Sequence, residues 1–231
     1  MARVNIHCPR CQSAQVYRHG QNPKGRDILR CRDCHRVFQL TYTYQARKPG
    51  MKELITEMAF NGAGVRDTAR TLKIGSNTVI RTFKKLAPKR ITSSPVTHAD
   101  VAFICELDEQ WSYVGSKARQ HWIWYAYNTK TGGVLAYTFG PRTDQTCREL
   151  LALLTPFNIG MLTSDDWGSY GREVPKNKHL TGKIFTQCIE RNNLTLRTRI
   201  KRLGRKTICF SRSVEIHEKV IGAFIEKHMF Y

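Results

Sequence analysis

The stretch CELDEQWSYVG, residues Cys105–Gly115, combines the apolar and aromatic residues of a β-strand with three carboxylates. Acids are scarce in this chain of 231 residues, which has 18 Asp and Glu against 38 Lys and Arg and a formal net charge of +20. Side chains alternate between the faces of a strand, so Asp108 and Glu109 are expected to point in opposite directions unless the strand bulges. Glu106 shares the face of Asp108. The pattern favours Asp108 as the functional acid, with Glu106 and Glu109 as supporting or surface groups.

A mixed α/β domain is predicted around this strand, over residues 101–231. Strands are expected at Val101–Val114, Gln120–Asn128, Gly133–Gly140 and Ile159–Ser164, and helices at Asp144–Leu154, Gln187–Leu203 and Val214–Lys227. The order is an acid-bearing strand, two antiparallel-looking strands, a helix, a strand ending in acid and a long helix, which resembles the ribonuclease-H-like fold. Enzymes of that fold place three carboxylates around two divalent ions for phosphoryl displacement. Hard oxygen ligands suit Mg²⁺ or Mn²⁺.

Three acids on separate segments qualify as catalytic and metal-binding carboxylates: Asp108, Asp165 and Glu190. Asp165 closes the strand IGMLTSDDW, and Glu190 opens the basic helix QCIERNNLTLRTRIKRLGRK. On this helix Glu190, Asn193 and Arg197 share one face, at spacings of three and seven residues. An acid among so many cations is expected where a metal ion and a phosphate meet. Taken singly, each of these acids is more often an ordinary surface charge, and it is their order and the type of segment that carries each of them that favour the catalytic reading.

The amino-terminal region carries CPRC and CRDC, separated by nineteen residues. This double Cys-x-x-Cys spacing is typical of a zinc ribbon, in which two turns present four thiolates to one structural Zn²⁺. The predicted zinc ligands are Cys8, Cys11, Cys31 and Cys34. A disulfide pair or a redox motif is the alternative, and His7, His19 or His35 could substitute as a ligand. The remaining cysteines are expected to be small core residues: Cys105, Cys147, Cys188 and Cys209.

Residues 51–86 are predicted to form a helix–turn–helix unit, with Gly75 in the turn and Ser76 as an N-cap. Apolar residues at helical spacing are expected to face inward: Leu54, Ile55, Met58, Val79, Phe83 and Leu86. The outward side of the last helix then presents the polar and basic side chains that a major-groove helix needs. The predicted DNA-binding residues there are Asn77, Thr78, Arg81, Lys84 and Lys85. A plain three-helix packing unit is the alternative.

The large positive charge favours nucleic acid as the partner, because neutralising phosphates releases counterions and rewards clustered Lys and Arg. The segment RTRIKRLGRK, residues 197–206, holds six cations and no acid. It is read either as a solvated helix or as a phosphate track through Arg197, Lys201 and Arg205. No apolar run approaches the ~18 residues of a membrane-spanning helix, and the first residues lack the apolar region of a secretion signal. The expected location is a bacterial or archaeal cytoplasm, in association with the nucleoid, with no membrane partner.

These patterns divide the chain into four segments. Residues 1–46 are the predicted zinc ribbon and residues 47–86 the all-α helix–turn–helix domain. Residues 87–100, which include APKRITSSPVTHAD, are rich in Pro, Ser and Thr and are predicted to be a linker. Residues 101–231 are the ribonuclease-H-like α/β catalytic domain.

The motifs together resemble the transposases of the insertion-sequence-one family. The similarity is carried by LDEQWSYVGSKARQHWIWYAY, SDDWGSY, QCIERNNLTLR and RLGRK, and by CPRC, CRDC, TYTYQARKPG and MAFNGAGVRDTAR in the amino-terminal part. It covers nearly the whole chain. It implies a DDE-type transposase that binds double-stranded DNA at terminal inverted repeats and performs metal-dependent cleavage and strand transfer. A homo-oligomer on DNA is expected, because two element ends must be brought together.

Carried over residue by residue, the family's first acid falls on Asp108. The Asp of its Thr-Asp-Gly-Trp element falls on Asp165, and the Glu of its Ile-Glu-Arg element falls on Glu190. Asp166 stands where the family has Gly, so both neighbouring Asp residues are candidates, with Asp165 favoured.

Two other classes of function stay open at this point. A tyrosine recombinase would form a covalent Tyr–phosphate link without metal, and its nearest candidate residues are Arg205, His217, Lys219 and Tyr231. A DNA-binding repressor with a non-catalytic carboxy-terminal domain would bind inverted repeats without nicking them. The late helix holds Glu215 and Glu218 together with His217, and these residues are expected on a solvated face.

Overall fold

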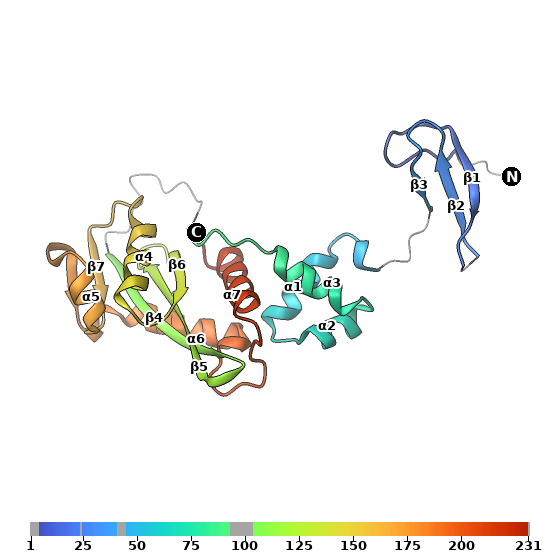
Figure 1. The fold of residues 1–231 in the computed structure, drawn as a ribbon. Coiled ribbons are helices and arrows are strands. Elements are labelled where there is room, and N and C mark those ends of the chain that lie inside the picture. Colours follow the sequence, from blue (N-terminus) through green and yellow to red (C-terminus); the bar gives the residue numbers. More distant parts are fainter. Residues whose placement is uncertain (1–4, 24, 41–44, 93–103, 231) are drawn as a thin grey trace. The chain divides into compact units, whose positions relative to one another are not determined.

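The computed structural model describes residues 5–23, 25–40, 45–92 and 104–230, in two compact units, residues 1–48 and 49–231 (Figure 1). Residues 93–100 of the predicted linker lie outside the described residues. The first three residues of the predicted strand Val101–Val114 and the candidate nucleophile Tyr231 also lie outside them.

The amino-terminal unit is built on a small antiparallel sheet. Its strands are β1 (Val16–Gln21), β2 (Asp27–Cys31) and β3 (Val37–Phe38), in that order, and a short helix, η1 (Gln45–Arg47), follows. The buried core, among the described residues, consists of Cys8, Leu29, Cys31 and Phe38. So few apolar side chains cannot offset the conformational entropy of ordering the whole segment. The unit therefore needs a further source of stability.

Three helices begin the second unit: α1 (Met51–Phe60), α2 (Val65–Leu72) and α3 (Ser76–Lys85). They confirm the predicted helical segment. Val79 and Phe83 of α3 face inward as predicted, since they are 0% and 2% exposed. Leu86 follows the end of α3 and packs against the same core.

Two details of the helical prediction are wrong. The N-cap of α3 is Gly75, and Ser76 is the first helical residue, whose hydroxyl makes no cap. The chain leaves α2 through Lys73 in the left-handed conformation, so that the extended residue before α3 falls on the glycine. Leu54 is 50% exposed, because the buried stripe of α1 runs through residues four apart. These residues are Met51, Ile55 and Ala59.

A five-stranded sheet with the order β6-β5-β4-β7-β8 organises the rest of this unit. The strands are β4 (Ile104–Val114), β5 (Ser116–Asn128), β6 (Gly133–Gly140), β7 (Met161–Ser164) and β8 (His179–Thr181). The first three form an antiparallel meander, whereas β7 and β8 run parallel to β4. This topology confirms the predicted ribonuclease-H-like α/β fold.

Helices cover both faces of the sheet (Figure 1), because side chains alternate along its central strands. On one face, Trp124 of β5 packs with α4 (Asp144–Leu154) and α5 (Gly168–Glu173). On the other face, Tyr125 packs with α6 (Gln187–Arg199) and α7 (Val214–His228). Two separate cores result, one on each side of β4 and β5.

Most elements of this domain have nearly the predicted bounds. Helix α4 and strand β6 match to the residue, and α6 is followed by the short helix η4 (Lys201–Leu203), which completes the predicted helical segment. The prediction missed four short elements, because none of them is long enough to show a period. These are α5, β8, η2 (Lys176–Lys178) and η3 (Lys183–Phe185).

The described part of the predicted linker, residues 87–92, lies along the outer edge of β6. The amide of Thr92 donates to the carbonyl of Leu135, and the amide of Tyr137 donates to the carbonyl of Arg90, each at 2.9 Å. The segment thereby covers backbone groups that would otherwise form an open sheet edge.

Helices α1–α3 share one hydrophobic core with α6, α7 and the adjoining face of the sheet. Phe60 of α1 meets Phe224 of α7 edge to face, with ring centroids 5.1 Å apart. In the turn after α1, Gly62 has a φ of 83°, and a Cβ at this position would lie 2.8 Å from Cβ of Lys201. Only glycine fits this conformation and this close approach. The helical segment is therefore packed into the α/β domain rather than tethered to it.

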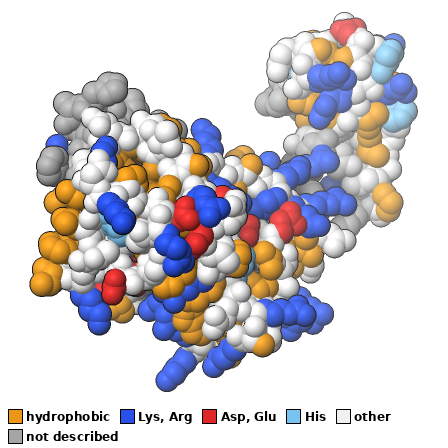
Figure 2. All heavy atoms as spheres, turned by 60° about the vertical axis from the view of Figure 1, so that its left-hand side comes forward, with side chains coloured by type: hydrophobic (Ala, Val, Ile, Leu, Met, Phe, Trp, Pro, Cys, Tyr) orange, Lys and Arg blue, Asp and Glu red, His pale blue; other side chains and the backbone are white. Residues whose placement is uncertain are grey.

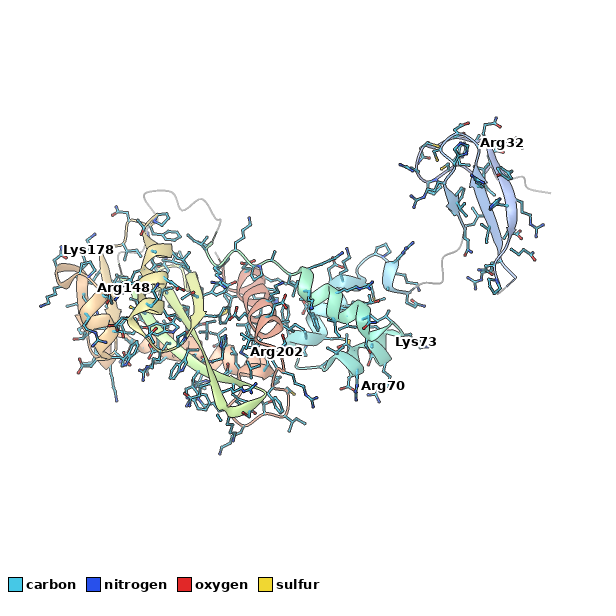
Figure 3. The ribbon with its side chains drawn as sticks, viewed as in Figure 1. Arg32, Arg70, Lys73, Arg148, Lys178 and Arg202 are labelled. Carbon is cyan, nitrogen blue, oxygen red and sulfur yellow. The ribbon has the colours of Figure 1, made fainter. Side chains whose placement is uncertain are left out.

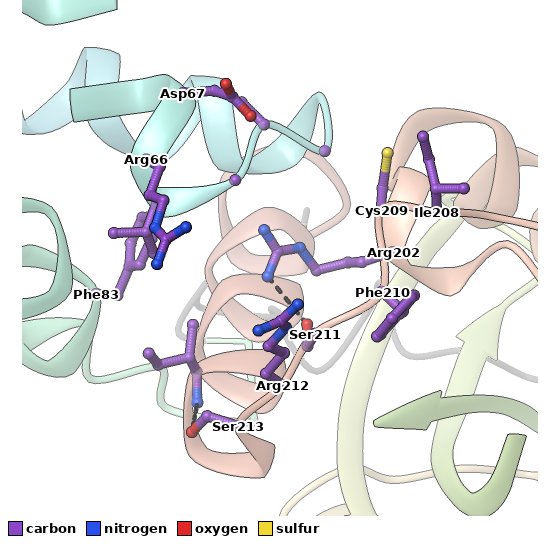
Figure 4. A pocket seen from close by; sticks show the side chains of 15 residues that line it. Arg66, Asp67, Phe83, Arg202, Ile208, Cys209, Phe210, Ser211, Arg212 and Ser213 are labelled. Carbon is purple, nitrogen blue, oxygen red and sulfur yellow. Dashed lines mark hydrogen bonds between the residues drawn. The ribbon is translucent and has the colours of Figure 1, made fainter. Parts of the chain in front are cut away.

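A buried chain of hydrogen bonds lies beside this junction, and Figure 4 shows its first link, from Arg202 to Ser211. Ser211 Oγ lies 3.0 Å from Nδ1 of His217, whose Nε2 lies 2.9 Å from Ser112 Oγ. The Ser112 hydroxyl donates to the carbonyl of His121, so it accepts from Nε2, and Nδ1 accepts from Ser211. The chain of bonds requires a neutral His217. This side chain is 0% exposed, and the expectation of a solvated face is wrong for it.

A pocket of about 520 Å³ lies beside this network (Figure 4). Its lining includes three arginines, Arg66, Arg202 and Arg212, and apolar side chains such as Phe83 and Ile216. None of the predicted catalytic acids lines it. The pocket therefore does not mark the predicted active site.

Lowering the pH is expected to reduce the contribution of His217 to the stability of the second unit. Burial, together with the nearby positive charges of His121 and Arg202, lowers the pKa of His217 to about 3, against about 6.5 in an unfolded chain. Below pH 6.5 the unfolded state takes up a proton that the folded state does not, so this contribution falls as the pH drops towards 3. Between pH 7 and pH 5 the loss is about 2 kcal/mol.

Urea unfolding of the wild type and of His217→Gln at pH 7 and at pH 5 measures this loss. Asp108 and Glu109, whose pKa values are raised, change the stability of both proteins in the opposite direction. From pH 7 to pH 5 the free energy of unfolding of the wild type is therefore expected to fall by about 2 kcal/mol relative to that of His217→Gln. His228→Gln is the matched control, because this histidine lies on the same helix and is exposed, and it is expected to behave like the wild type. A His217→Gln protein with the full wild-type pH dependence would contradict the assignment.

Basic side chains are prominent on the surface in Figure 2, in keeping with the net charge of +20. In Figure 3, Arg70 and Lys73 mark the end of α2, and Arg148 lies on α4. Arg70 pairs with Asp67 at 3.0 Å, a solvent-exposed ion pair of small energetic weight. No helix in the described part of the chain has the length and apolar character needed to cross a membrane.

Candidate active site and metal centres

The three acids of strand β4 have side chains that lie in different surroundings. Asp108 and Glu109 are consecutive in the β4–β5 ladder, so their side chains start on opposite faces of the sheet. Glu106 is buried, and its carboxylate accepts the amide N–H of Ile189 at 2.5 Å in the first turn of α6. A carboxylate at this position satisfies an unpaired amide and the helix dipole. Glu106 therefore ties α6 to β4.

Asp165 lies beside Asp108 because β7 ends next to it. The parallel ladder pairs Glu106 of β4 with Thr163 of β7, and each acid follows its partner by two residues. Carboxylate oxygens of Asp108, Asp165 and Glu109 lie within 4.8 Å of one another. Among the described residues no other acids gather so closely.

The face of α6 that carries Asn193 and Arg197 lies towards Asp108, as predicted. The side-chain amide of Asn193 donates to the Asp108 carboxylate. Burial lowers the pKa of Arg197, and the Asp108 carboxylate opposes this shift, so the two charges interact. Glu190 is exposed, and its carboxylate lies outside the group of oxygens within 4.8 Å. The structure thus brings together two of the three predicted acids and places the third on the adjoining helix.

Burial raises the pKa of Asp108 and of Glu109, the two members of the acid group that lie on β4. The pKa of Asp108 rises to about 6, because burial and the charges of Asp165 and Glu190 outweigh the hydrogen bonds from the Glu109 amide and Asn193. The pKa of Glu109 rises to about 7, again mainly through burial, with like charges adding to the shift. Carboxylates in such surroundings are stabilised as anions by a nearby cation. The group therefore has the electrostatics of a cation site.

Glu109 is not a surface group, and it approaches Asp108 without a bulge. Its side chain is 2% exposed, and the register shift of β4 lies further on, at Tyr113. The Asp108 carboxylate bends back to accept the Glu109 amide at 2.8 Å. Asp165 follows the end of β7, where oxygens from both faces of β4 can meet. Strand periodicity cannot reveal this, because it does not show where the neighbouring strand ends.

The oxygen donors suit a divalent cation. Carboxylate oxygens are the hard ligands that Mg²⁺ and Mn²⁺ prefer, and Mg²⁺ holds them at about 2.0–2.1 Å. Oxygens within 4.8 Å of one another can reach a shared ion with small side-chain rotations. Asp108 and Asp165 are the residues that would hold it, with Glu109 adjacent.

The four amino-terminal cysteines suit a tetrahedral ion. Their sulfurs lie within 4.8 Å of one another, with 3.5 Å between Cys8 and Cys34 and 3.6 Å between Cys11 and Cys31. Zn–S bonds of about 2.3 Å place tetrahedral sulfurs about 3.8 Å apart. All eight cysteines are free thiols, so the structure holds none of the disulfides that were the alternative. Sulfur donors in this number and spacing suit structural Zn²⁺.

Most predicted DNA-binding side chains are accessible. On α3, Thr78 is half-buried and the other four are exposed: Asn77, Arg81, Lys84 and Lys85. Arg197 is half-buried beside Asp108, and Lys201 is exposed. The Arg205 guanidinium lies over the ring of Trp111, 4.7 Å from its centroid.

The solitary cysteines divide into two pairs. Cys105 and Cys147 are buried core residues, as expected. Cys188 is exposed and Cys209 is half-buried, so the expectation is wrong for these two. Cys188 lies in the first turn of α6, and Cys209 lies in the irregular segment after η4. Neither position belongs to a periodic apolar stripe.

Comparisons with known proteins cover most of the chain. A family model described as IS1 transposase matches residues 102–231, and models of the InsA C-terminal and N-terminal domains match residues 42–86 and 1–35. The chain is 93% identical to the InsB protein of insertion element iso-IS1n from Shigella dysenteriae over 131 residues, 57% of this chain and 100% of that protein. It is 90% identical to the iso-IS1N InsA protein of the same organism over 84 residues, 36% of this chain and 93% of that protein. An Escherichia coli K12 relative, the IS1 4 InsB protein, is 46% identical over 63% of this chain and 88% of its own length.

Among solved structures, the catalytic core domain of BIV integrase aligns with a TM-score of 0.36 and 17% identity, over 52% of this chain and 82% of that chain. A chain of the simian T-cell lymphotropic virus intasome complex aligns with the same TM-score and 12% identity, over 80% of this chain and 66% of that chain. Both likenesses are weak, and the fold assignment rests on the strand order.

Proposed function

Because the chain belongs to the IS1 transposase family, we propose that it cuts the ends of an insertion sequence and joins them to target DNA as a DDE-type enzyme. The proposed catalytic carboxylates are Asp108, Asp165 and Glu190. The observation that carries the proposal is the group of acid oxygens within 4.8 Å at the junction of β4 and β7. It lies inside the segment matched by the transposase model.

The proposed reaction consists of two displacements at phosphorus. In the first, a water oxygen bonds to the phosphorus at the element end, the bond to the 3′ oxygen breaks, and this oxygen takes up a proton. In the second, the freed 3′-hydroxyl attacks a phosphodiester of the target, and a target 3′ oxygen leaves. Mg²⁺ or Mn²⁺, when bound by the carboxylates, would activate the attacking oxygen and stabilise the leaving one.

The residues around the centre orient its groups. Asn193 fixes the Asp108 carboxylate through a hydrogen bond, and Glu106 holds the first turn of α6 against β4. Glu190 and Arg197 therefore keep their positions on the helix face next to Asp108. Arg197 supplies positive charge where a phosphate must approach carboxylates.

DNA is held, in this proposal, by the segments outside the centre. The zinc ribbon, residues 1–46, and the helix–turn–helix domain, residues 47–86, select the terminal inverted repeat. Residues 87–100 join them to the catalytic domain, residues 101–231. Helix α3 enters the major groove, and its contacts are Asn77, Thr78, Arg81, Lys84 and Lys85. Arg197, Lys201 and Arg205 contact the DNA backbone, and a homo-oligomer at the nucleoid brings two ends together.

An end-cleavage and strand-transfer assay tests the proposal. With inverted-repeat duplex, target DNA and Mg²⁺, the expected products are nicked ends with free 3′-hydroxyls and joined target strands, and EDTA is expected to abolish both. A covalent protein–DNA adduct formed in EDTA would indicate a tyrosine recombinase instead. Repeat binding without nicking would indicate a repressor.

A further inference from the structure

Glu109 is tied to the catalytic group by a closed set of contacts. Tyr170 Oη donates to its carboxylate at 2.9 Å, and Arg142 Nε donates at 2.7 Å. The Arg142 guanidinium lies over the ring of Trp167, 4.3 Å from the centroid. The amide of Trp167 donates to the Asp165 carboxylate at 3.2 Å. The contact between Arg142 and Trp167 therefore links the residue that holds Glu109 to the one that holds Asp165.

Stability does not account for a carboxylate in this place. A buried ion pair contributes little net stability, because the desolvation of the charges offsets their attraction. Glu109 also lies within 4.8 Å of two other carboxylates, which repel it. Its neighbour Arg142 is 38% exposed and has access to water. An apolar residue at position 109 would avoid both the repulsion and the desolvation.

The negative charge of the three acids in this region is not fully neutralised by the arginines beside them. Asp108, Asp165 and Glu109 bring three negative charges within 4.8 Å. Arg142 is engaged with Glu109 on one side of β4, and Arg197 interacts with Asp108 on the other. Two half-exposed guanidiniums flank the group, but neither bridges the three acids.

We infer that Glu109 supplies a fourth carboxylate to the divalent-cation site, and that Arg142 is the positioning residue that holds it there. This inference rests on the proposed function, since it concerns the same site. In the competing account Glu109 only neutralises Arg142, which would otherwise repel the cation. Removing both side chains separates the two accounts, because a neutraliser is not needed once Arg142 is gone.

Calorimetric titration of Mn²⁺ into the zinc-loaded full-length protein, without DNA, tests the inference. Glu109→Gln is expected to weaken Mn²⁺ binding about 10- to 100-fold. The double variant Glu109→Gln/Arg142→Gln is expected to remain as weak. Tyr170→Phe keeps the carboxylate and is expected to bind like wild type. Glu173→Gln is the matched control, because Glu173 also pairs with an arginine but lies outside the acid group.

Wild-type affinity in Glu109→Gln, or affinity restored by the second substitution, would overturn the inference. Wild-type affinity in Asp108→Asn would have a different meaning, since it would remove the cation site itself and with it the proposed function. Unfolding midpoints without Mn²⁺ check that each variant folds. If Glu109→Gln does not fold, Glu109→Asp withdraws the carboxylate by one methylene group and carries the same expectation.

Discussion

Asp108→Asn is expected to slow end cleavage by about a thousandfold while leaving inverted-repeat binding unchanged. The substitution keeps the shape of the side chain and one of its two hydrogen-bond acceptors, but it removes a ligand charge from the proposed cation site. Metal assistance contributes several kcal/mol to such transition states, and a loss of ~4 kcal/mol corresponds to roughly a thousandfold in rate. The initial rate of 3′-end formation at saturating Mg²⁺ measures the effect.

The neighbouring acids provide the controls. Asp165→Asn is expected to be as slow as Asp108→Asn, whereas Asp166→Asn is expected to stay active, because Asp166 is exposed and outside the acid group. The reverse pattern for these two residues would move the assignment to Asp166. Burial raises the pKa of Asp108, so the neutral side chain of Asn offsets part of the stability that is lost with the second acceptor. Full activity of Asp108→Asn would refute the site.

Loss of zinc is expected to unfold the amino-terminal unit and abolish inverted-repeat binding, while the second unit stays folded. The buried core of the amino-terminal unit is very small, and two of its members are themselves cysteines. Zinc binding to small domains of this kind contributes about 10–16 kcal/mol, which far exceeds what such a core supplies. The second unit has its own cores on both faces of the sheet and does not depend on the ribbon for them.

Cys31→Ser and chelation of the wild-type protein are two routes to this state. The measurements are zinc per chain, protease sensitivity of residues 1–48 and binding to repeat duplex. Cys188→Ser is the matched control, because this cysteine is exposed and outside the sulfur group, and it is expected to retain zinc and binding. A zinc-free protein whose amino-terminal unit resists protease would contradict the prediction.

Elements with a long hydrophobic period were predictable from the sequence. Helix α4 has the predicted bounds because its apolar stripe is uninterrupted, and Val79 and Phe83 face inward because three-residue and four-residue spacings define a helix face. The order of the strands and their acids was sufficient to predict the fold. Asp108 and Asp165 lie close together because that topology makes their strands neighbours.

What the sequence did not reveal depends on contacts between distant segments. Strand alternation places Glu109 on the face opposite Asp108 and so predicts a supporting or surface role for it. The alternation holds along β4, but it gives no information on the length of β7, which ends at Ser164. His217 is expected on a solvated face because Glu215 and Glu218 lie beside it in the sequence. In the structure it points into the junction with η4, where Ser112 and Ser211 satisfy both ring nitrogens. A polar side chain with partners far along the chain cannot be distinguished by pattern from a solvated one.

The core that α1–α3 share with α6 and α7 fixes the distance between the proposed DNA-reading helix and the proposed active site. Phe60 packs on Phe224, and Gly62 lies against Lys201, so the proposed reading helix and the proposed catalytic acids belong to one compact unit. The number of base pairs between the sequence that α3 reads and the phosphate that is cut is then set by the protein rather than by the bending of the DNA. Cleavage by one subunit should therefore occur at a constant distance from its recognition sequence. Base pairs inserted between the recognition sequence and the original cleavage site should move the cut away from that original site, because the protein keeps its own spacing.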